Sequence, residues 1–134
     1  MAKKGPFIYT KIDSLEGKPK VFSGSCAGLV QWYTTAGLAK TWKEGMVVKG
    51  SGSKIKKGTA VATFVNGRYP NKPSGNHAAL YISQDANGVY VMDQWKSKPT
   101  IGKRLMRFKG GKRADGTFPD SSNNGSALSV IMHE

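Results

Sequence analysis

The residue best suited to nucleophilic chemistry in this chain is Cys26, its single cysteine. Gly24 and Ser25 precede it, and because Ser25 is a good N-cap we expect Cys26 to lie in the first turn of a helix. Backbone N–H groups at that end of a helix are unpaired and carry a partial positive charge, which lowers a thiol pKa and favours the thiolate. Many lone cysteines are instead small buried hydrophobic residues, and Cys26 alone does not decide between these interpretations.

A thiol nucleophile needs a base, and the sequence offers two histidines, His77 and His133. His77 follows Ser74-Gly75-Asn76 and opens an apolar run over residues 78–82, which predicts a strand. A histidine there lies at the edge of a sheet beside a loop, where it can face the start of a helix. A surface histidine at a strand end fits the same pattern. His133 is the penultimate residue, and because chain ends often fray it is the poorer base.

A catalytic imidazole is usually oriented by a carboxylate or an amide that fixes its tautomer. Of the 8 acidic residues, Asp93 is the one that falls within a predicted strand. Asp85-Ala86-Asn87-Gly88 predicts a hairpin turn, which brings His77 close to Asp93 and Gln94 on the returning strand. Asp93 and Gln94 point to opposite faces of that strand, so only one of them can be the partner of His77. The plainer interpretation of Asp93 is a solvated charge paired with a lysine.

The elements that must bring these residues together are a helix and a sheet. We expect the helix over residues 26–36, with an apolar face that includes Leu29 and Trp32, and with Gly37 as its stop. Strands are predicted over residues 59–65, 77–83, 89–95, 105–108 and 128–132. This order predicts an α+β fold, with one N-terminal helix packed on a small antiparallel sheet of about four to six strands.

The remaining segments are expected to be irregular. Residues 1–25 read as a basic lead-in, and residues 38–44 as a second short helical segment or turn. Residues 45–57 and 66–76 are expected to be loops, and residues 109–126 a mobile loop.

Length and composition bound the class of protein. A chain of 134 residues suits a single domain, and no repeat or shift in composition divides it. A single cysteine excludes an internal disulfide and a four-cysteine zinc site, and no His, Asp or Glu cluster has zinc-ligand spacing. No run approaches ~18 apolar residues, so we expect no membrane insertion. The basic N-terminus lacks the apolar region of a secretory signal peptide.

The charge balance points to a polyanionic partner. With 21 Lys and Arg against 8 Asp and Glu, the net charge is +13. Nucleic acid, anionic lipid and anionic cell wall all qualify as partners of such a surface, and charge alone does not choose among them.

Several motifs occur in an order that is found in a known superfamily. The expected helix that carries the cysteine begins in Gly24-Ser25-Cys26-Ala27-Gly28-Leu29-Val30-Gln31. A strand over residues 58–64 follows it, and then the strand that carries the histidine, Gly75-Asn76-His77-Ala78-Ala79-Leu80-Tyr81-Ile82. In this order the chain resembles the papain-like cell-wall cysteine amidases and peptidases of the NlpC and CHAP type. Residues 67–71, residues 75–79 and Asp93-Gln94-Trp95 resemble more closely a small bacterial family related to these amidases. The resemblance covers about residues 26–108 and a closing strand over residues 123–131.

The resemblance implies a cysteine hydrolase that cleaves an amide bond in the peptide stems of peptidoglycan without a metal or other cofactor. It implies Cys26 as the nucleophile and His77 as the general base. Asp93 is our preferred third residue, because a carboxylate both orients an imidazole and stabilises its cationic form. Gln94, which can only orient the ring, is the alternative.

Residues around this expected site are candidates for binding substrate. Arg68 and Tyr69 precede the histidine strand and border the expected cleft, and Trp95 is placed to wall it. Two basic segments are candidates for binding the anionic polymer, or else are solvated basic faces: residues 49–57 and the cluster Lys103, Arg104, Arg107, Lys109, Lys112 and Arg113.

The expected substrate also bears on localisation and partners. Because peptidoglycan lies outside the cytoplasm, we expect a chain made in the cytoplasm that acts in the periplasm or cell wall of a target bacterium. Type VI secretion of an antibacterial toxin would deliver it, and release through a holin, as for a phage lysis enzyme, is the other route. A delivered toxin implies a cognate immunity protein that is acidic where it meets this basic surface.

A second class of function fits the composition. A non-catalytic basic β-rich module could bind nucleic acid or an anionic cell-wall polymer, and interleaved Lys, Arg and aromatic residues suit it. Such a module has no need of Cys26 at a helix start or of His77 behind Gly-Asn. We therefore favour the enzyme and do not expect nucleic acid to be the partner.

Overall fold

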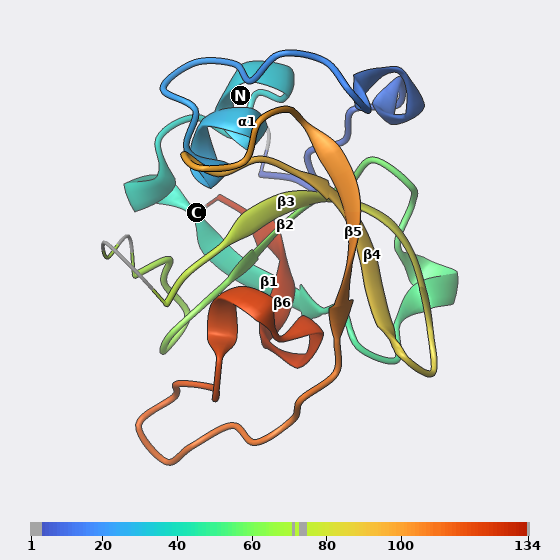
Figure 1. Ribbon diagram of the computed structural model, residues 1–134. Helices are drawn as coiled ribbons and strands as arrows, with labels where there is room; N and C mark the ends of the chain where they lie inside the picture. The colour runs from blue at the N-terminus through green and yellow to red at the C-terminus, as the bar shows by residue number, and fades with distance from the viewer. Residues whose placement is uncertain (1–3, 71, 73–74, 134) are drawn as a thin grey trace.

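The structure is a computed structural model that describes residues 4–70, 72 and 75–133. Its one α-helix, α1 (Cys26–Tyr33), packs against a six-stranded sheet in which neighbouring strands are antiparallel (Figure 1). The strands are β1 (Lys43–Val47), β2 (Ala60–Thr63), β3 (Ala78–Asp85), β4 (Gly88–Asp93), β5 (Gly102–Arg107) and β6 (Leu128–Met132). Their order across the sheet is β1-β6-β2-β3-β4-β5. The predicted α+β fold, with the helix at the front of the chain on a small antiparallel sheet, is confirmed.

Helix α1 begins at Cys26, as predicted. Ser25 has extended backbone angles, and its hydroxyl accepts a hydrogen bond from the N–H of Gly28 at 3.1 Å. The helix ends at Tyr33 rather than three residues later, because Thr34 has extended backbone angles and its hydroxyl accepts from the Ala36 N–H at 3.1 Å in place of a helical carbonyl. The predicted apolar face was too wide: Leu29 and Val30 are buried, whereas Trp32 is 59% exposed.

Both faces of the sheet are covered by apolar side chains. On the α1 side, Leu29 and Val30 pack in one cluster with Leu80, Met92 and Trp42. The opposite side holds a second cluster built on Tyr81, Val89, Val91, Met106 and Leu128. Each strand that has α1 on one face therefore contributes alternate residues to the two clusters, which is the periodicity of a strand buried on both sides.

The N-terminal segment is part of the core, which the prediction of an irregular lead-in missed. Phe7, Ile12 and Leu15 are buried, and Ile12–Leu15 forms a 3-10 turn. The backbone of this segment is also tied to the sheet, since the Ala60 N–H donates to the Phe7 carbonyl at 2.7 Å. The cluster that α1 packs on is therefore completed by residues that precede it in sequence.

The segment over residues 38–57 also differs from the prediction. Ala39–Thr41 is a 3-10 turn, but Lys43–Val47 is strand β1, where a turn and a loop were expected. Strand β1 lies at the edge of the sheet beside β6, with one further bridge from Lys43 to Arg68, and Met46 and Val47 are about half exposed. Such a strand lacks the alternation of buried and exposed residues by which a strand is recognised in a sequence. Gly52–Lys54 forms a further 3-10 turn within the predicted loop.

Residues 109–126 also hold more structure than a loop. Ser121–Asn123 and Gly125–Ala127 are 3-10 turns, and Asn124 between them is buried. The Asn124 side chain accepts from the Lys109 N–H at 2.9 Å and donates to the Pro119 carbonyl at 3.0 Å, so it joins the two ends of the segment. The mobility of this segment stays a prediction. Within the described residues, no helix is long and apolar enough to cross a membrane.

Gly58 lies where the backbone of the N-terminal segment approaches the start of β2 closely. It has φ +97°, its carbonyl accepts from the Tyr9 N–H at 2.9 Å, and a Cβ placed on it would lie 2.2 Å from the Tyr9 carbonyl oxygen. We expect Gly58→Ala to lower the free energy of unfolding by about 3 kcal/mol or more, because it combines a left-handed residue with a backbone clash. Gly50 has φ +81° but open space around it, so Gly50→Ala should cost only about 1 kcal/mol. Urea denaturation of both variants measures the difference, and equal losses would contradict this account of the N-terminal contact.

Candidate active site

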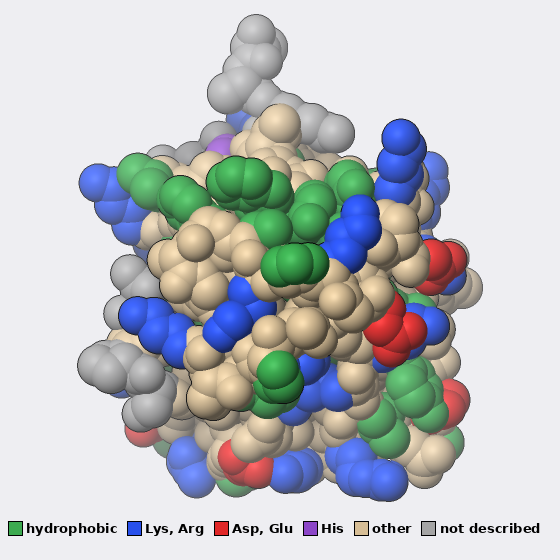
Figure 2. All heavy atoms as spheres, turned by 45° about the horizontal axis from the view of Figure 1, so that its top comes forward, with side chains coloured by type: hydrophobic (Ala, Val, Ile, Leu, Met, Phe, Trp, Pro, Cys, Tyr) green, Lys and Arg blue, Asp and Glu red, His purple; other side chains and the backbone are tan. Residues whose placement is uncertain are grey.

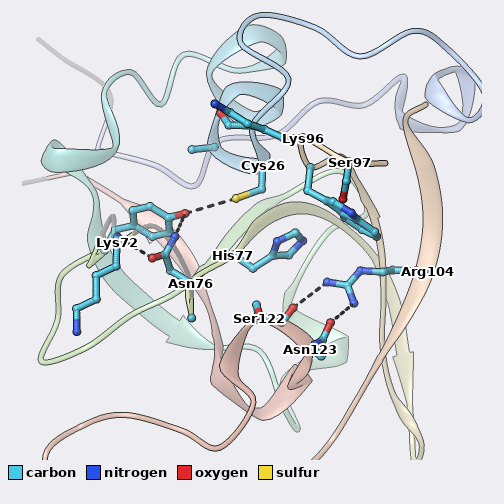
Figure 3. A pocket seen from close by; sticks show the side chains of 14 residues that line it. Cys26, Lys72, Asn76, His77, Lys96, Ser97, Arg104, Ser122 and Asn123 are labelled. Atoms are coloured by element: carbon cyan, nitrogen blue, oxygen red, sulfur yellow. Dashed lines mark hydrogen bonds between the residues drawn. The ribbon is translucent and has the colours of Figure 1, made fainter. Parts of the chain in front are cut away.

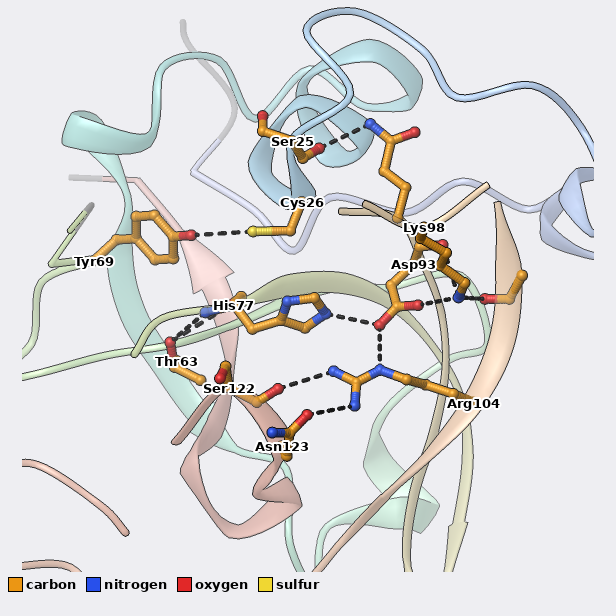
Figure 4. Close-up of polar contacts among 12 residues, drawn as sticks. Ser25, Cys26, Thr63, Tyr69, His77, Asp93, Lys98, Arg104, Ser122 and Asn123 are labelled. Atoms are coloured by element: carbon orange, nitrogen blue, oxygen red, sulfur yellow. Dashed lines mark hydrogen bonds and ion pairs between the residues drawn. The ribbon is translucent and has the colours of Figure 1, made fainter. Parts of the chain in front are cut away.

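Cys26, His77 and Asp93 lie together at one end of the sheet, although they come from three different elements (Figure 4). Cys26 opens α1, His77 immediately precedes β3, and Asp93 is the last residue of β4. His77 Nε2 lies 2.7 Å from Asp93 Oδ2, and both side chains are buried. His77 is also held by its backbone, because its N–H donates to the Thr63 hydroxyl at 2.9 Å at the end of β2. The imidazole is thus fixed between Cys26 and a buried carboxylate.

Asp93 and Gln94 point to opposite faces of the sheet, and only Asp93 contacts His77. The Gln94 side chain turns toward the segment before α1, where its Oε1 accepts from the Val21 N–H at 3.0 Å. Its Nε2 donates to the Val21 carbonyl at 3.0 Å and to the Ser25 carbonyl at 2.8 Å. Gln94 therefore fixes the N-cap of the helix that carries Cys26, a positioning role that sequence reasoning missed.

Two further cations surround the Asp93 carboxylate. Lys98 Nζ lies 2.7 Å from Asp93 Oδ1, and Arg104 Nε lies 2.7 Å from Asp93 Oδ2. Arg104 also donates to the Asn123 side chain at 3.0 Å and to the Ser122 carbonyl at 2.9 Å. The sequence suggested that Arg104 was part of a basic face for polymer, but its guanidinium is occupied within the protein. Strand register could have indicated this, since Arg104 pairs with Val91, two residues before Asp93 on the same face of the sheet.

The pKa values of the three groups depend on one another. Burial raises the pKa of the Cys26 thiol, but the hydrogen bond and charge of His77 outweigh it and lower the pKa to about 7. Burial lowers the pKa of His77, but Asp93 and Cys26 raise it above its usual value. Burial also raises the pKa of Asp93, whereas His77 and Arg104 together lower it to about 2. The arrangement favours a thiolate–imidazolium pair near neutral pH.

A pocket of about 970 Å³ opens beside Cys26 and His77 (Figure 3). Tyr69 and Trp95, both predicted to border the cleft, line it, and the Tyr69 hydroxyl lies 3.6 Å from Cys26 Sγ. Trp95 also supports the cations around Asp93, since Lys98 Nζ lies 4.6 Å from the centre of its ring. Arg68 does not line this pocket. It forms backbone bridges with Lys43 and Val65 instead.

Lys72 and Lys96 add positive charge to the pocket lining. No group of three or more His, Cys, Asp and Glu residues in the described part of the chain is arranged to hold a metal ion. The chemistry available at this site is that of a thiolate beside an imidazolium, with cationic side chains around it.

Comparison with known proteins identifies the family. Residues 8–131 match the sequence profile described as domesticated amidase effector 2. The chain belongs to this family. The predicted resemblance to papain-like cell-wall amidases is thereby confirmed. A curated relative from Salmonella typhi, the type VI secretion amidase effector 2 protein, is 44% identical in an alignment of 132 residues that covers 94% of this chain and 98% of that protein.

Two further members of the amidase effector 2 family are similar to this chain. The domesticated amidase effector 2 of Ixodes scapularis is 36% identical over 81 residues, which are 60% of this chain and 51% of that protein. A solved structure of type 6 secretion amidase effector 2 (Tae2) superposes with a TM-score of 0.92 at 43% identity, covering 97% of this chain and 96% of that one.

The pair of Cys26 and His77 can be tested by the pH dependence of thiol alkylation. Because Cys26 is the single cysteine, iodoacetamide reports on this thiol alone. We expect the alkylation rate to rise with a midpoint near pH 7, where the thiolate forms. In His77→Ala the midpoint should move above about 8.5, since burial then acts on the thiol without its cationic partner.

His133→Ala is the matched control, because it removes the other histidine of the chain, which hydrogen bonds to the Ala36 carbonyl away from Cys26. Its alkylation midpoint should equal that of the wild type. A wild-type midpoint in the ordinary thiol range, unmoved by His77→Ala, would show that the pair does not form.

Proposed function

We propose that this chain is an amidase toxin of type VI secretion that hydrolyses amide bonds in the peptide stems of peptidoglycan. Membership of the amidase effector 2 family, at 44% identity to a type VI secretion amidase effector, supports the activity. The observation that carries the mechanism is the buried contact of 2.7 Å between His77 and Asp93, with Cys26 at a helix start beside the imidazole.

In the proposed mechanism Cys26 is the nucleophile. The thiolate attacks the carbonyl carbon of the amide, so that the sulfur–carbon bond forms and the carbonyl π electrons move to oxygen. His77, protonated in the resting pair, gives its proton to the leaving nitrogen as the carbon–nitrogen bond breaks. A water molecule, deprotonated by the now neutral His77, then attacks the thioester and releases the acid and the thiolate.

Asp93 and the helix start support these steps. Asp93 accepts from His77 Nε2, which leaves the other ring nitrogen to face the substrate and stabilises the imidazolium. N–H groups in the first turn of α1, including that of Cys26, have no partner within the helix and can donate to the oxyanion. Gln94 acts on the same step indirectly, because it holds the Ser25 carbonyl at the N-cap.

The proposal extends to the whole chain and its partners. We infer that residues 1–134 act as one catalytic domain, because the family match spans residues 8–131 and the N-terminal segment completes the core. Lys and Arg side chains are spread over the face drawn in Figure 2, with few acidic ones among them. This surface, on a chain of net charge +13, suits the anionic wall of a target cell and an immunity protein with an acidic contact surface.

Release of soluble fragments from purified sacculi tests the amidase proposal. Wild-type protein should release peptides or muropeptides whose new carboxyl and amino ends identify the amide bond that was cut. Cys26→Ala should abolish release, because no other thiol is present. Asp93→Asn should lower kcat at least about tenfold, because the His77 imidazolium loses its carboxylate. Asp85→Asn makes the same change at an exposed hairpin residue and should leave kcat unchanged.

Two results would contradict the proposal. The amidase proposal would be wrong if wild-type protein released no fragments, or if Cys26→Ala protein released as many as wild type. Binding of DNA that weakens steeply with salt, without fragment release, would favour the basic binding module instead.

A further inference from the structure

The Tyr69 hydroxyl is buried against the sulfur of Cys26. Tyr69 lies between β2 and β3, is 6% exposed, and its ring packs on Trp42 with ring centroids 4.9 Å apart. Its Oη lies 3.6 Å from Cys26 Sγ and points at it across the pocket (Figure 4). The packing of the ring fixes the direction of the hydroxyl, so the contact is not that of a freely turning side chain.

The hydrogen bonds around Tyr69 determine which way its proton points. Asn76 Oδ1 accepts a hydrogen bond from the Lys72 backbone N–H at 2.7 Å. A backbone N–H can only donate, so the atom of Asn76 that faces it must be the oxygen. The other end of the same amide, Nδ2, therefore faces Tyr69 Oη at 3.0 Å and donates to it. Because the phenol oxygen accepts from Asn76, its single proton is left for the sulfur side.

We propose that Tyr69 is a catalytic residue that donates a hydrogen bond to the oxyanion formed when Cys26 attacks the amide, and that Asn76 is the positioning residue that directs this donor. The inference rests on the proposed thiolate mechanism. As the sulfur–carbon bond forms, negative charge leaves the sulfur and appears on the former carbonyl oxygen, two bonds away. A donor that faces the thiolate in the resting enzyme is within reach of that oxygen, where fixed donors are most effective.

The hydroxyl acts as a donor and keeps its proton. Burial raises the pKa of Tyr69, and the neighbouring Cys26 raises it further, so the phenol stays neutral while it donates. It would complement the N–H groups at the start of α1, which approach from the helix side. The direction of the Tyr69 proton cannot be read from the sequence, because it depends on the hydrogen bonds that Asn76 makes with Lys72 and Tyr69.

The test is Tyr69→Phe, which keeps the ring on Trp42 and removes only the hydroxyl. Two reactions of Cys26 are compared: hydrolysis of muropeptides and alkylation by iodoacetamide. Alkylation displaces iodide from a methylene carbon and forms no oxyanion, whereas amide hydrolysis does. We expect kcat to fall about 100-fold with KM changed less than about threefold. The alkylation rate on its high-pH plateau should stay within about twofold of wild type, and its midpoint should rise because the thiolate loses a donor.

Two further variants sharpen the test. Tyr90→Phe removes a surface hydroxyl that contacts Asp85, so it should match wild type in both reactions. Asn76→Asp keeps an acceptor for the Lys72 N–H but offers Tyr69 an acceptor instead of a donor, which draws its proton away from Cys26. It should lower kcat, and adding it to Tyr69→Phe should cost little more, because the two residues act as a unit.

Three outcomes would overturn the inference. A Tyr69→Phe protein with kcat within about threefold of wild type would show that no oxyanion donor was lost. Equal losses of kcat and of the plateau alkylation rate would show that Tyr69 affects the reactivity of the thiol or the structure of the site, and not the oxyanion. If Cys26 of the wild-type protein is alkylated normally but the protein cleaves no muropeptide, the amidase proposal is wrong, and this inference is wrong with it.

Discussion

The carboxylate of Asp93 is buried among three groups that are or can become cations: His77, Lys98 and Arg104. A buried carboxylate is costly unless such partners satisfy it, and here each of its oxygens is bonded. The rest of the site depends on this contact. Asp93 raises the pKa of His77, and His77 in turn lowers the pKa of Cys26 to about 7. Lys98 and Arg104 keep Asp93 ionised and hold it in place without touching the thiol.

The alternation of side chains along β4 continues to Gln94, so Asp93 and Gln94 have two different roles. Asp93 points to the face of Val91, toward His77 and Arg104, whereas Gln94 points to the face of Met92, which α1 covers. Gln94 holds the carbonyl of the N-cap residue Ser25, and Asp93 holds the imidazole. One short strand end therefore sets both the position of the nucleophile and the orientation of its base. A shift of one residue in the register of β4 would turn Asp93 toward the α1 side of the sheet and Gln94 toward the other side.

The features of the site that depend on residues close together in the sequence were predicted well. Ser25 before an apolar helix defined the start of α1, and the Asp85–Gly88 turn placed Asp93 near His77 on the hairpin. The edge strand β1 was missed because it pairs with β6, near the other end of the chain, and its residues are only partly buried. Arg104 was assigned to a basic face and Lys98 was not singled out, because the residues next to them in the sequence do not show that both side chains form ion pairs with a buried carboxylate. Part of the net charge of +13 is thus used inside the site rather than on a partner.

The central claim is that Asp93 keeps His77 cationic beside the thiol. An NMR titration of the imidazole nitrogens tests it directly, because the chain has only two histidines. In the wild type, His77 should titrate above the usual histidine pKa of about 6.5, and in Asp93→Asn its pKa should fall. A His77 that titrates at or below about 6.5 in the wild type, and does not move in Asp93→Asn, would contradict the account.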